Sequence, residues 1–120
     1  MKAHLDVITL AVRDLEKAVA FYRDGLGLPT KGIVATEFKA TPENAAGAAA
    51  FFEMESGIML ALYPRQELAK DAGISNSSPS SVEFSLGYIA ESQAAVDKLL
   101  ARAVAAGASR TEPPRDRPWG

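Results

Sequence analysis

Residues 5–29, LDVITLAVRDLEKAVAFYRDGLGLP, decide the fold of this chain. Residues 5–12 are rich in Val, Ile and Thr and contain few polar side chains, which is typical of a largely buried strand. Asp14 follows at the position of a helix N-cap, where a carboxylate accepts hydrogen bonds from free amide groups. The stretch therefore predicts a strand that leads directly into a helix.

The helix that follows Asp14 has one apolar stripe with helical spacing. The members of the stripe are Leu15, Ala18, Val19, Tyr22 and Leu26. Gly25 or Gly27 supplies the left-handed residue that ends a helix, and Pro29 prevents the helix from resuming. The pattern predicts an amphipathic helix over about residues 15–26.

Three strands are predicted after this helix, over about residues 33–39, 48–55 and 58–63. Ser56 and Gly57 mark a tight hairpin turn between the second and third of these strands. Residues 65–72 are expected to form a short surface helix. The first module of the chain thus has the order β-α-β-β-β.

A weaker copy of the same pattern begins after the polar run of residues 75–81. It predicts a strand over residues 82–88, a helix over residues 92–106 that ends at Gly107, and a short strand near residues 109–112.

The fold class that we expect is α+β, with tandem βαβββ modules. The expected domain organisation is one domain, residues 1–120, made of module 1 (1–64), a linker (65–80) and an incomplete module 2 (81–120). The second module lacks two strands after its first β-α-β. We therefore expect a truncated chain whose unpaired sheet edge is covered by a second copy.

The composition is that of an ordinary globular chain of 120 residues, 48% apolar and 23% charged. A net charge of −2 and the absence of any long Lys/Arg run argue against nucleic acid as a partner. No apolar stretch is long enough to span a membrane, and no secretory signal is visible. Cysteine is absent, which excludes disulfides and thiolate ligands. The expected location is cytoplasmic.

Two parts of the chain resemble a known superfamily. Residues 12–22, VRDLEKAVAFY, and the following Gly25-Leu26-Gly27 are similar to the opening motif of the vicinal oxygen chelate superfamily. That superfamily includes glyoxalase I, extradiol dioxygenases and bleomycin resistance proteins. Residues 105–108, with Pro113-Pro114 and Trp119-Gly120, resemble the second module of its glyoxalase-like branch. The resemblance implies paired modules whose curved sheets form a cup around a small-molecule ligand, within a homodimer.

The resemblance also implies where a metal would bind, because catalytic members hold a divalent metal between His and Glu side chains that face the cup. The first ligand position corresponds to Val7 and the second lies within residues 60–62, Leu-Ala-Leu. The third lies within residues 82–84, where Glu83 is the one possible ligand, and the fourth falls beyond Gly120. We therefore predict no metal site and no cofactor, with a divalent metal only under the enzymatic alternative.

Five residues are candidate ligand contacts. Tyr63 ends the strand that reaches the cup in the superfamily, and Glu37 lies in a predicted strand whose neighbours face the cup. Trp119 resembles the aromatic residue before the final hairpin of the glyoxalase-like branch. Phe52 and Tyr88 have the side chains expected of an apolar pocket wall. An ordinary place in the core or on the surface is the alternative for each of them.

Two pairs of titratable residues have the two-residue spacing that puts side chains on one strand face. His4 with Asp6, and Glu53 with Glu55, have the spacing of an acid–base pair. Each pair lies at a strand end or beside a hairpin turn, so we expect both to be solvated surface groups. No motif for nucleophilic catalysis or phosphate binding is present.

The leading hypothesis is a glyoxalase-like small-molecule-binding protein without the metal site of the superfamily, which sequesters a toxic or antibiotic compound. The main alternative is an enzyme, namely a metal-dependent lyase, isomerase or dioxygenase of the same superfamily. A third hypothesis is an interaction module or a nonfunctional fragment. Metal analysis of the purified protein separates the first two hypotheses.

Overall fold

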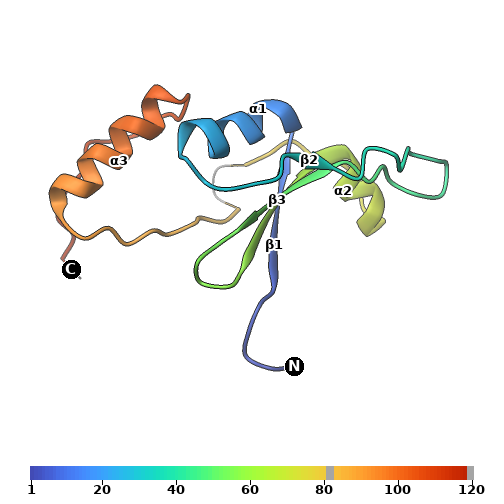
Figure 1. Ribbon diagram of the computed structural model, residues 1–120, viewed down its shortest axis with the longest axis horizontal. Helices are drawn as coiled ribbons and strands as arrows, with labels where there is room; N and C mark the ends of the chain where they lie inside the picture. Colours follow the sequence, from blue (N-terminus) through green and yellow to red (C-terminus); the bar gives the residue numbers. More distant parts are fainter. Residues whose placement is uncertain (81–82, 119–120) are drawn as a thin grey trace. The chain divides into compact units, whose positions relative to one another are not determined.

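The computed structural model describes residues 1–80 and 83–118 (Figure 1). The chain divides into two compact units, Met1–Ser78 and Pro79–Gly120. The boundary between the units falls within the polar run of residues 75–81. The first unit contains the sheet and is described first.

The first unit is built on a four-stranded mixed sheet with the strand order β1-β4-β3-β2. Its strands are β1 (Val7–Val12), β2 (Ile33–Val34), β3 (Ala49–Glu53) and β4 (Met59–Pro64). β1 and β4 are parallel, whereas the other two pairs of neighbours are antiparallel. A helix, Leu15–Ala20, lies between β1 and β2 in the chain, so the α+β class and the β-α-β-β-β order of the first module are confirmed.

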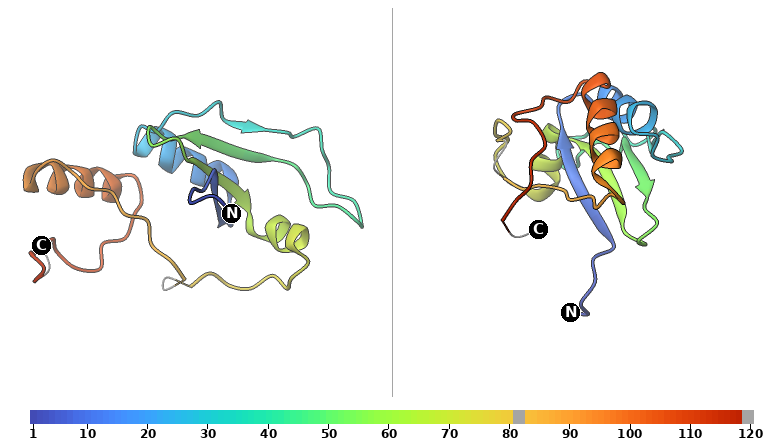
Figure 2. Two further views of the ribbon diagram at one scale, coloured as in Figure 1. Left: turned by 90° about the horizontal axis from the view of Figure 1, so that it is seen from below. Right: turned by 90° about the vertical axis from the view of Figure 1, so that its left-hand side faces the viewer.

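Helix α1 (Leu15–Ala20) packs on one face of this sheet and continues into a π-helical turn, η1 (Phe21–Gly25) (Figure 2). Asp14 is the N-cap, as predicted, and its carboxylate accepts a hydrogen bond from the Lys17 amide over 3.1 Å. Gly27 has a left-handed φ of 75° just after this turn. The core between α1 and the sheet is formed by Leu10, Val19, Ala50, Phe52, Leu60 and Leu62.

Strand β2 is shorter than predicted, because it ends at Val34 and not near residue 39. Ala35 adopts a left-handed φ of 60°, and the Phe38 amide donates to the Ala35 carbonyl over 3.3 Å. The chain therefore turns immediately after β2. Glu37 lies in that turn and is exposed, so the strand placement predicted for Glu37 is wrong.

The remaining elements of the first unit follow the predicted order. A turn closed by a hydrogen bond of 2.9 Å from the Gly57 amide to the Met54 carbonyl joins β3 to β4. Helix α2 (Arg65–Ala72) begins directly after β4, as predicted, and ends at Gly73, whose φ is 71°.

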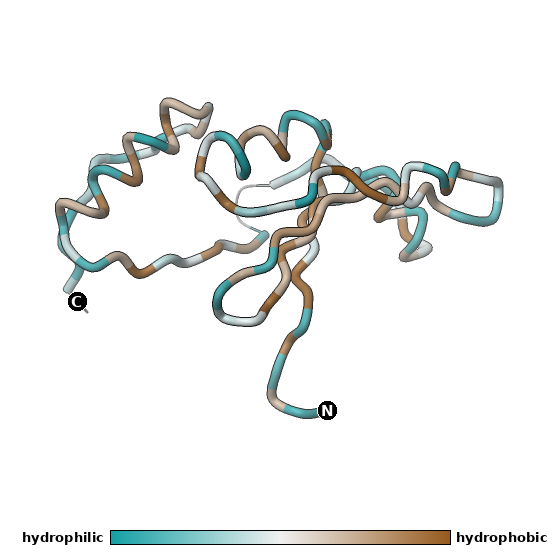
Figure 3. Tube along the Cα trace, viewed as in Figure 1, coloured by the Kyte–Doolittle hydropathy of each residue, from teal (hydrophilic) through white to brown (hydrophobic). Residues whose placement is uncertain are grey.

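The second unit contains helix α3 (Gln93–Ala105), which begins at Ser92 and is followed by Gly107 with a φ of 116°. Helix α3 carries both apolar and polar residues along its length (Figure 3). Strands were predicted over residues 82–88 and 109–112. The structure has no strand in the described part of these ranges, so both predictions are wrong there. Residues 83–88 have no partner strand there, and a strand exists only where its backbone pairs with another. Val82 lies outside the described residues.

In the described part of the chain, no helix is long and apolar enough for a membrane crossing.

Candidate ligand-binding site

The sheet face opposite α1 carries the candidate site. Successive side chains of a strand alternate between the two faces, so the neighbours of the core residues point away from α1. The strand register groups these residues on one surface, which we call the outer face. The outer face consists of Val7, Thr9, Ala11, Val34, Ala49, Phe51, Glu53, Met59, Ala61 and Tyr63.

A hollow of about 580 Å³ lies at the β2–β3 side of the outer face. Its volume is within the range of about 300–1,000 Å³ that small-molecule sites occupy. Four outer-face residues line the hollow together with the loop that precedes β2. The lining residues are Pro29, Thr30, Lys31, Gly32, Val34, Phe51, Glu53 and Met59.

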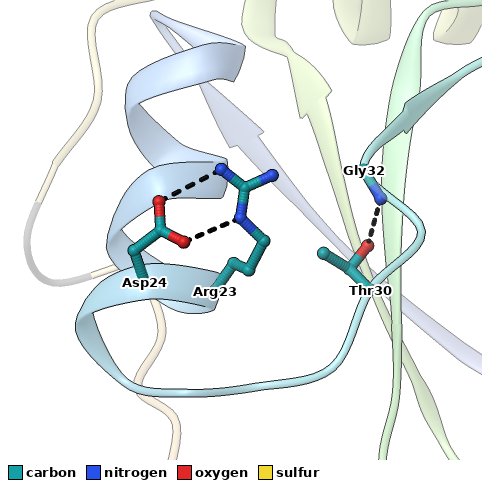
Figure 4. A network of polar contacts seen from close by, with 4 residues as sticks. All are labelled: Arg23, Asp24, Thr30 and Gly32. Atoms are coloured by element: carbon teal, nitrogen blue, oxygen red, sulfur yellow. Dashed lines mark hydrogen bonds and ion pairs between the residues drawn. The ribbon is translucent and has the colours of Figure 1, made fainter.

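The loop of residues 29–32 forms one wall of the hollow and is fixed to β3 by Thr30. The Thr30 hydroxyl donates to the Phe51 carbonyl over 2.6 Å. It also accepts from the Gly32 amide over 3.2 Å (Figure 4). Gly32 has a φ of 86°, which a glycine adopts without strain. The wall is thus held in place by hydrogen bonds before any ligand arrives.

The neighbouring turn η1 carries an exposed ion pair. The Arg23 guanidinium binds both carboxylate oxygens of Asp24, over 2.9 and 3.1 Å (Figure 4). The hydrogen bonds with Arg23 lower the pKa of Asp24, and the same contact raises the pKa of Arg23. Exposed pairs of this kind contribute little to stability, and neither residue lines the hollow.

The first two metal-ligand positions of the resembling superfamily fall on the outer face at Val7 and Ala61, which carry no donor atoms. Val7 pairs with Met59, and Ala61 pairs with Thr9 one step along the same face. Leu60 and Leu62 lie in the core. Glu83 accepts a hydrogen bond from the Ser80 amide over 3.2 Å. Within residues 1–80 and 83–118, no three His, Cys, Asp or Glu side chains gather as metal ligands. The side chains at Val7 and Ala61 therefore do not fit a metal held in the superfamily's way.

Tyr63 stands at the other end of the outer face and anchors a loop. Its hydroxyl donates to the Ala46 carbonyl, while the Ala46 amide donates to the Glu67 carboxylate over 2.8 Å. Lys70 of α2 also donates to the Thr41 carbonyl. Three side chains from β4 and α2 thus hold the backbone of the loop between β2 and β3, which we call the anchored loop (residues 35–48).

We expect Tyr63→Phe to lower the free energy of unfolding by about 1 kcal/mol near neutral pH, because the Ala46 carbonyl loses its donor. Burial, followed by the carboxylates of Asp71 and Glu67, raises the pKa of Tyr63 above its ordinary value of 10.0. A raised pKa favours the neutral phenol in the folded state. Its stabilising effect is therefore complete below pH 10.0 and is lost as the pH rises through the folded-state pKa.

Urea unfolding at neutral and at alkaline pH measures this effect. The difference between the wild type and Tyr63→Phe should shrink as the pH rises above 10.0. Tyr88→Phe is the matched control, because Tyr88 is 77% exposed and belongs to the second unit. A difference that stays constant across this pH range would show that the hydroxyl proton does not hold the loop.

The other predicted contact residues are scattered. Phe52 is completely buried in the core behind the outer face, so its ring is not exposed to the hollow. Glu37 lies in the turn of the anchored loop, and Tyr88 lies in the second unit. Trp119 lies outside the described residues. Among the predicted contacts that the structure describes, Tyr63 alone lies on the outer face, further along β4 than the hollow.

The acidic and histidine pairs are exposed. His4 and Asp6 approach to 3.6 Å between the imidazole Nε2 and a carboxylate oxygen, in front of β1. Glu53 lines the hollow, whereas Glu55 lies in the β3–β4 turn. Of these two carboxylates only Glu53 borders the hollow, so Glu53 and Glu55 do not form a pair at this site.

Of the residues that line the hollow, only Glu53 was considered as a site residue from sequence; Thr30, Lys31, Phe51 and Met59 are among those that were missed. The alternation in β3 gives a signal for Phe51, because Phe51 and Phe52 are adjacent and must point to opposite faces. No local signal identifies Thr30, whose partner Phe51 is 21 residues away along the chain.

Comparison with known proteins gives a family and a set of similar structures. The family model described as Glyoxalase/Bleomycin resistance protein/Dioxygenase superfamily matches residues 4–120. A glyoxalase-related enzyme from Fulvimarina pelagi superposes with a TM-score of 0.76 at 29% identity, over 98% of this chain and 75% of that chain. A lactoylglutathione lyase from Agrobacterium tumefaciens gives a TM-score of 0.61 at 25% identity, over 100% of this chain and 81% of that chain.

A fosfomycin resistance protein from Listeria monocytogenes, a mutant solved with Mn(II), gives a TM-score of 0.54 at 22% identity, over 97% of this chain and 75% of that chain. At this identity the likeness shows the fold alone. No curated protein matches the chain.

Proposed function

This chain belongs to the Glyoxalase/Bleomycin resistance protein/Dioxygenase superfamily, and we propose that it is a small-molecule-binding protein. The hollow on the outer face is the proposed binding site. The homodimer and the cytoplasmic location expected from the sequence belong to this proposal, as does a role in sequestering a toxic or antibiotic compound.

The single observation that supports binding at this site is the way the hollow is built. Val34, Phe51 and Met59 line it with apolar side chains on a paired sheet. The loop of residues 29–32 closes one side through the Thr30 hydrogen bonds. A rigid, mostly apolar concavity with a few polar groups is the usual form of a small-molecule site, because little conformational entropy is lost on binding.

The absence of donor atoms at Val7 and Ala61 supports binding without the superfamily's metal. A rigid apolar site can retain a ligand without performing chemistry on it. Binding of this kind is enough for sequestration.

Phe51→Ala tests the proposal. Truncation removes the largest apolar surface of the hollow, so we expect an aromatic ligand to bind about fivefold more weakly. Aromatic compounds and apolar antibiotics are screened by the amide NMR shifts of Gly32, Phe51 and Met59, and the affinities of the hits are then measured by calorimetry. Phe38→Ala is the control, because Phe38 is also exposed but lies in the anchored loop. Hits whose affinity is unchanged in Phe51→Ala would contradict binding in the hollow.

The rival function is a metal-dependent lyase, isomerase or dioxygenase. It is favoured by the likeness, at 25–29% identity, to solved structures described as a lactoylglutathione lyase and a glyoxalase-related enzyme. Metal analysis of the purified chain decides between the two. Stoichiometric Ni, Zn, Fe or Mn, together with an activity that chelation abolishes, would replace the binding function by the enzymatic one.

A further inference from the structure

Two opposite charges line the proposed binding hollow without neutralising each other. Lys31 stands on the loop wall and Glu53 at the end of β3, and both border the same volume. Over the described residues, neither the Lys31 ammonium nor the Glu53 carboxylate forms an ion pair or a hydrogen bond. Their separation therefore exceeds that of an ion pair.

Some other charges of the chain are paired. Arg23 pairs with Asp24, and Arg115 and Arg117 both pair with Glu112, over 3.3 and 2.8 Å. The two charges of the hollow are thus available to a ligand. They are also partly fixed in space, because Thr30 holds the wall next to Lys31 and the strand pairing with Met59 holds Glu53.

The rest of the hollow is mostly apolar. Val34, Phe51 and Met59 line the hollow together with Lys31 and Glu53. A ligand that fills this volume takes water away from both charged groups. Removing water from a charged group that gains no new partner costs free energy. A ligand with one charge satisfies one of the two groups and leaves the other without a partner.

We infer that the hollow selects amphoteric small molecules, in which an apolar body carries both an amine and an acid group. The amine binds the Glu53 carboxylate, the acid group binds the Lys31 ammonium, and the apolar body contacts Phe51. This inference rests on the proposed function, because it names the class of ligand for the same site.

Four probes with the same phenyl body test the inference on the full chain. Phenylalanine carries both charges, 2-phenylethylamine carries only the amine, 3-phenylpropanoate carries only the acid group, and 3-phenylpropanol carries no charge. NMR titration gives the four dissociation constants. We expect phenylalanine to bind about threefold more tightly than each singly charged probe, because ion pairs at exposed groups are weak. High salt should reduce this preference through screening.

Two substitutions assign the charges. Glu53→Gln should make phenylalanine and 3-phenylpropanoate bind equally, because the amine has lost its partner. Lys31→Met should make phenylalanine and 2-phenylethylamine bind equally. Glu55→Gln is the matched control, since Glu55 lies in the adjacent turn and does not line the hollow. Each variant is compared with the wild type by thermal unfolding, so that a loss of fold is recognised.

The outcomes separate this inference from the proposed function. If 3-phenylpropanol binds as tightly as phenylalanine, and Phe51→Ala weakens both, the hollow is a binding site and the amphoteric preference is overturned. If none of the four probes shifts the amides of the hollow, the binding site itself is rejected, and the inference with it.

Discussion

Phe52→Ala is expected to lower the free energy of unfolding by about 3–5 kcal/mol, the range found when a buried aromatic ring is truncated. Phe52 is completely buried between the sheet and α1. Its ring meets the Tyr22 ring in an edge-to-face arrangement, with 6.0 Å between the ring centroids. Small domains have a total stability of about 5–15 kcal/mol, so the loss is a large fraction of the whole.

Urea unfolding followed by far-ultraviolet circular dichroism measures this loss. Phe51→Ala is the matched control, because the same residue type is removed one position away on the other face of β3. Phe51 is 40% exposed, so its truncation should cost much less, about 1 kcal/mol. Similar losses at the two positions would contradict the assignment of Phe52 to the core and Phe51 to the outer face.

The elements that were predicted correctly are those whose sequence signals, such as caps and apolar stripes, lie within a few residues of each other. The cap at Asp14 and the apolar stripe that begins at Leu15 specify α1. The bounds of α2, Arg65–Ala72, agree with the prediction, and Gly73 ends this helix in the left-handed conformation. In such segments, capping and periodicity act on the same backbone, so no knowledge of the rest of the chain is needed.

The elements that were predicted wrongly depend on partners elsewhere in the chain. Residues 83–88 have the alternation of a strand, with Phe84, Leu86 and Tyr88 exposed on the described segment. Alternation cannot show whether a partner strand is present. In β2, the left-handed Ala35 ends the strand early, and alanine gives no sequence signal for that conformation.

The candidate site was predictable only in part for the same reason. The resemblance located Val7 and residues 60–62, and the register then selected Ala61 as the outer-face member. The hollow depends on the contact between Thr30 and β3, which joins residues 21 positions apart. Tyr63 stays a predicted ligand contact, and the role that its hydroxyl has in the anchored loop, binding the Ala46 carbonyl, had no signal in the sequence.

Gly47→Ala is the second substitution with a large expected effect, a loss of about 1–3 kcal/mol in the free energy of unfolding. A Cβ atom at this position would lie 2.8 Å from the Phe38 Cβ and 3.0 Å from the Ala35 carbonyl oxygen. Both neighbouring atoms belong to or adjoin the backbone, so a simple rotamer change does not relieve the overlap. The Gly47 amide also donates to the Phe38 carbonyl over 2.9 Å, and a shift that made room would strain this bond.

The anchored loop resists such a shift because Ala46, the residue before Gly47, is held on both sides. Ala46 is bound through its carbonyl by Tyr63 and through its amide by Glu67. Gly87→Ala is the matched control, since no atom lies within 4 Å of a Cβ placed there. Phe38→Gly in the Gly47→Ala background removes the nearer overlap, so it should recover part of the loss in a double-mutant cycle. If Gly47→Ala is as stable as Gly87→Ala, the loop is free to move despite Tyr63 and Glu67, and the three side chains from β4 and α2 do not anchor it.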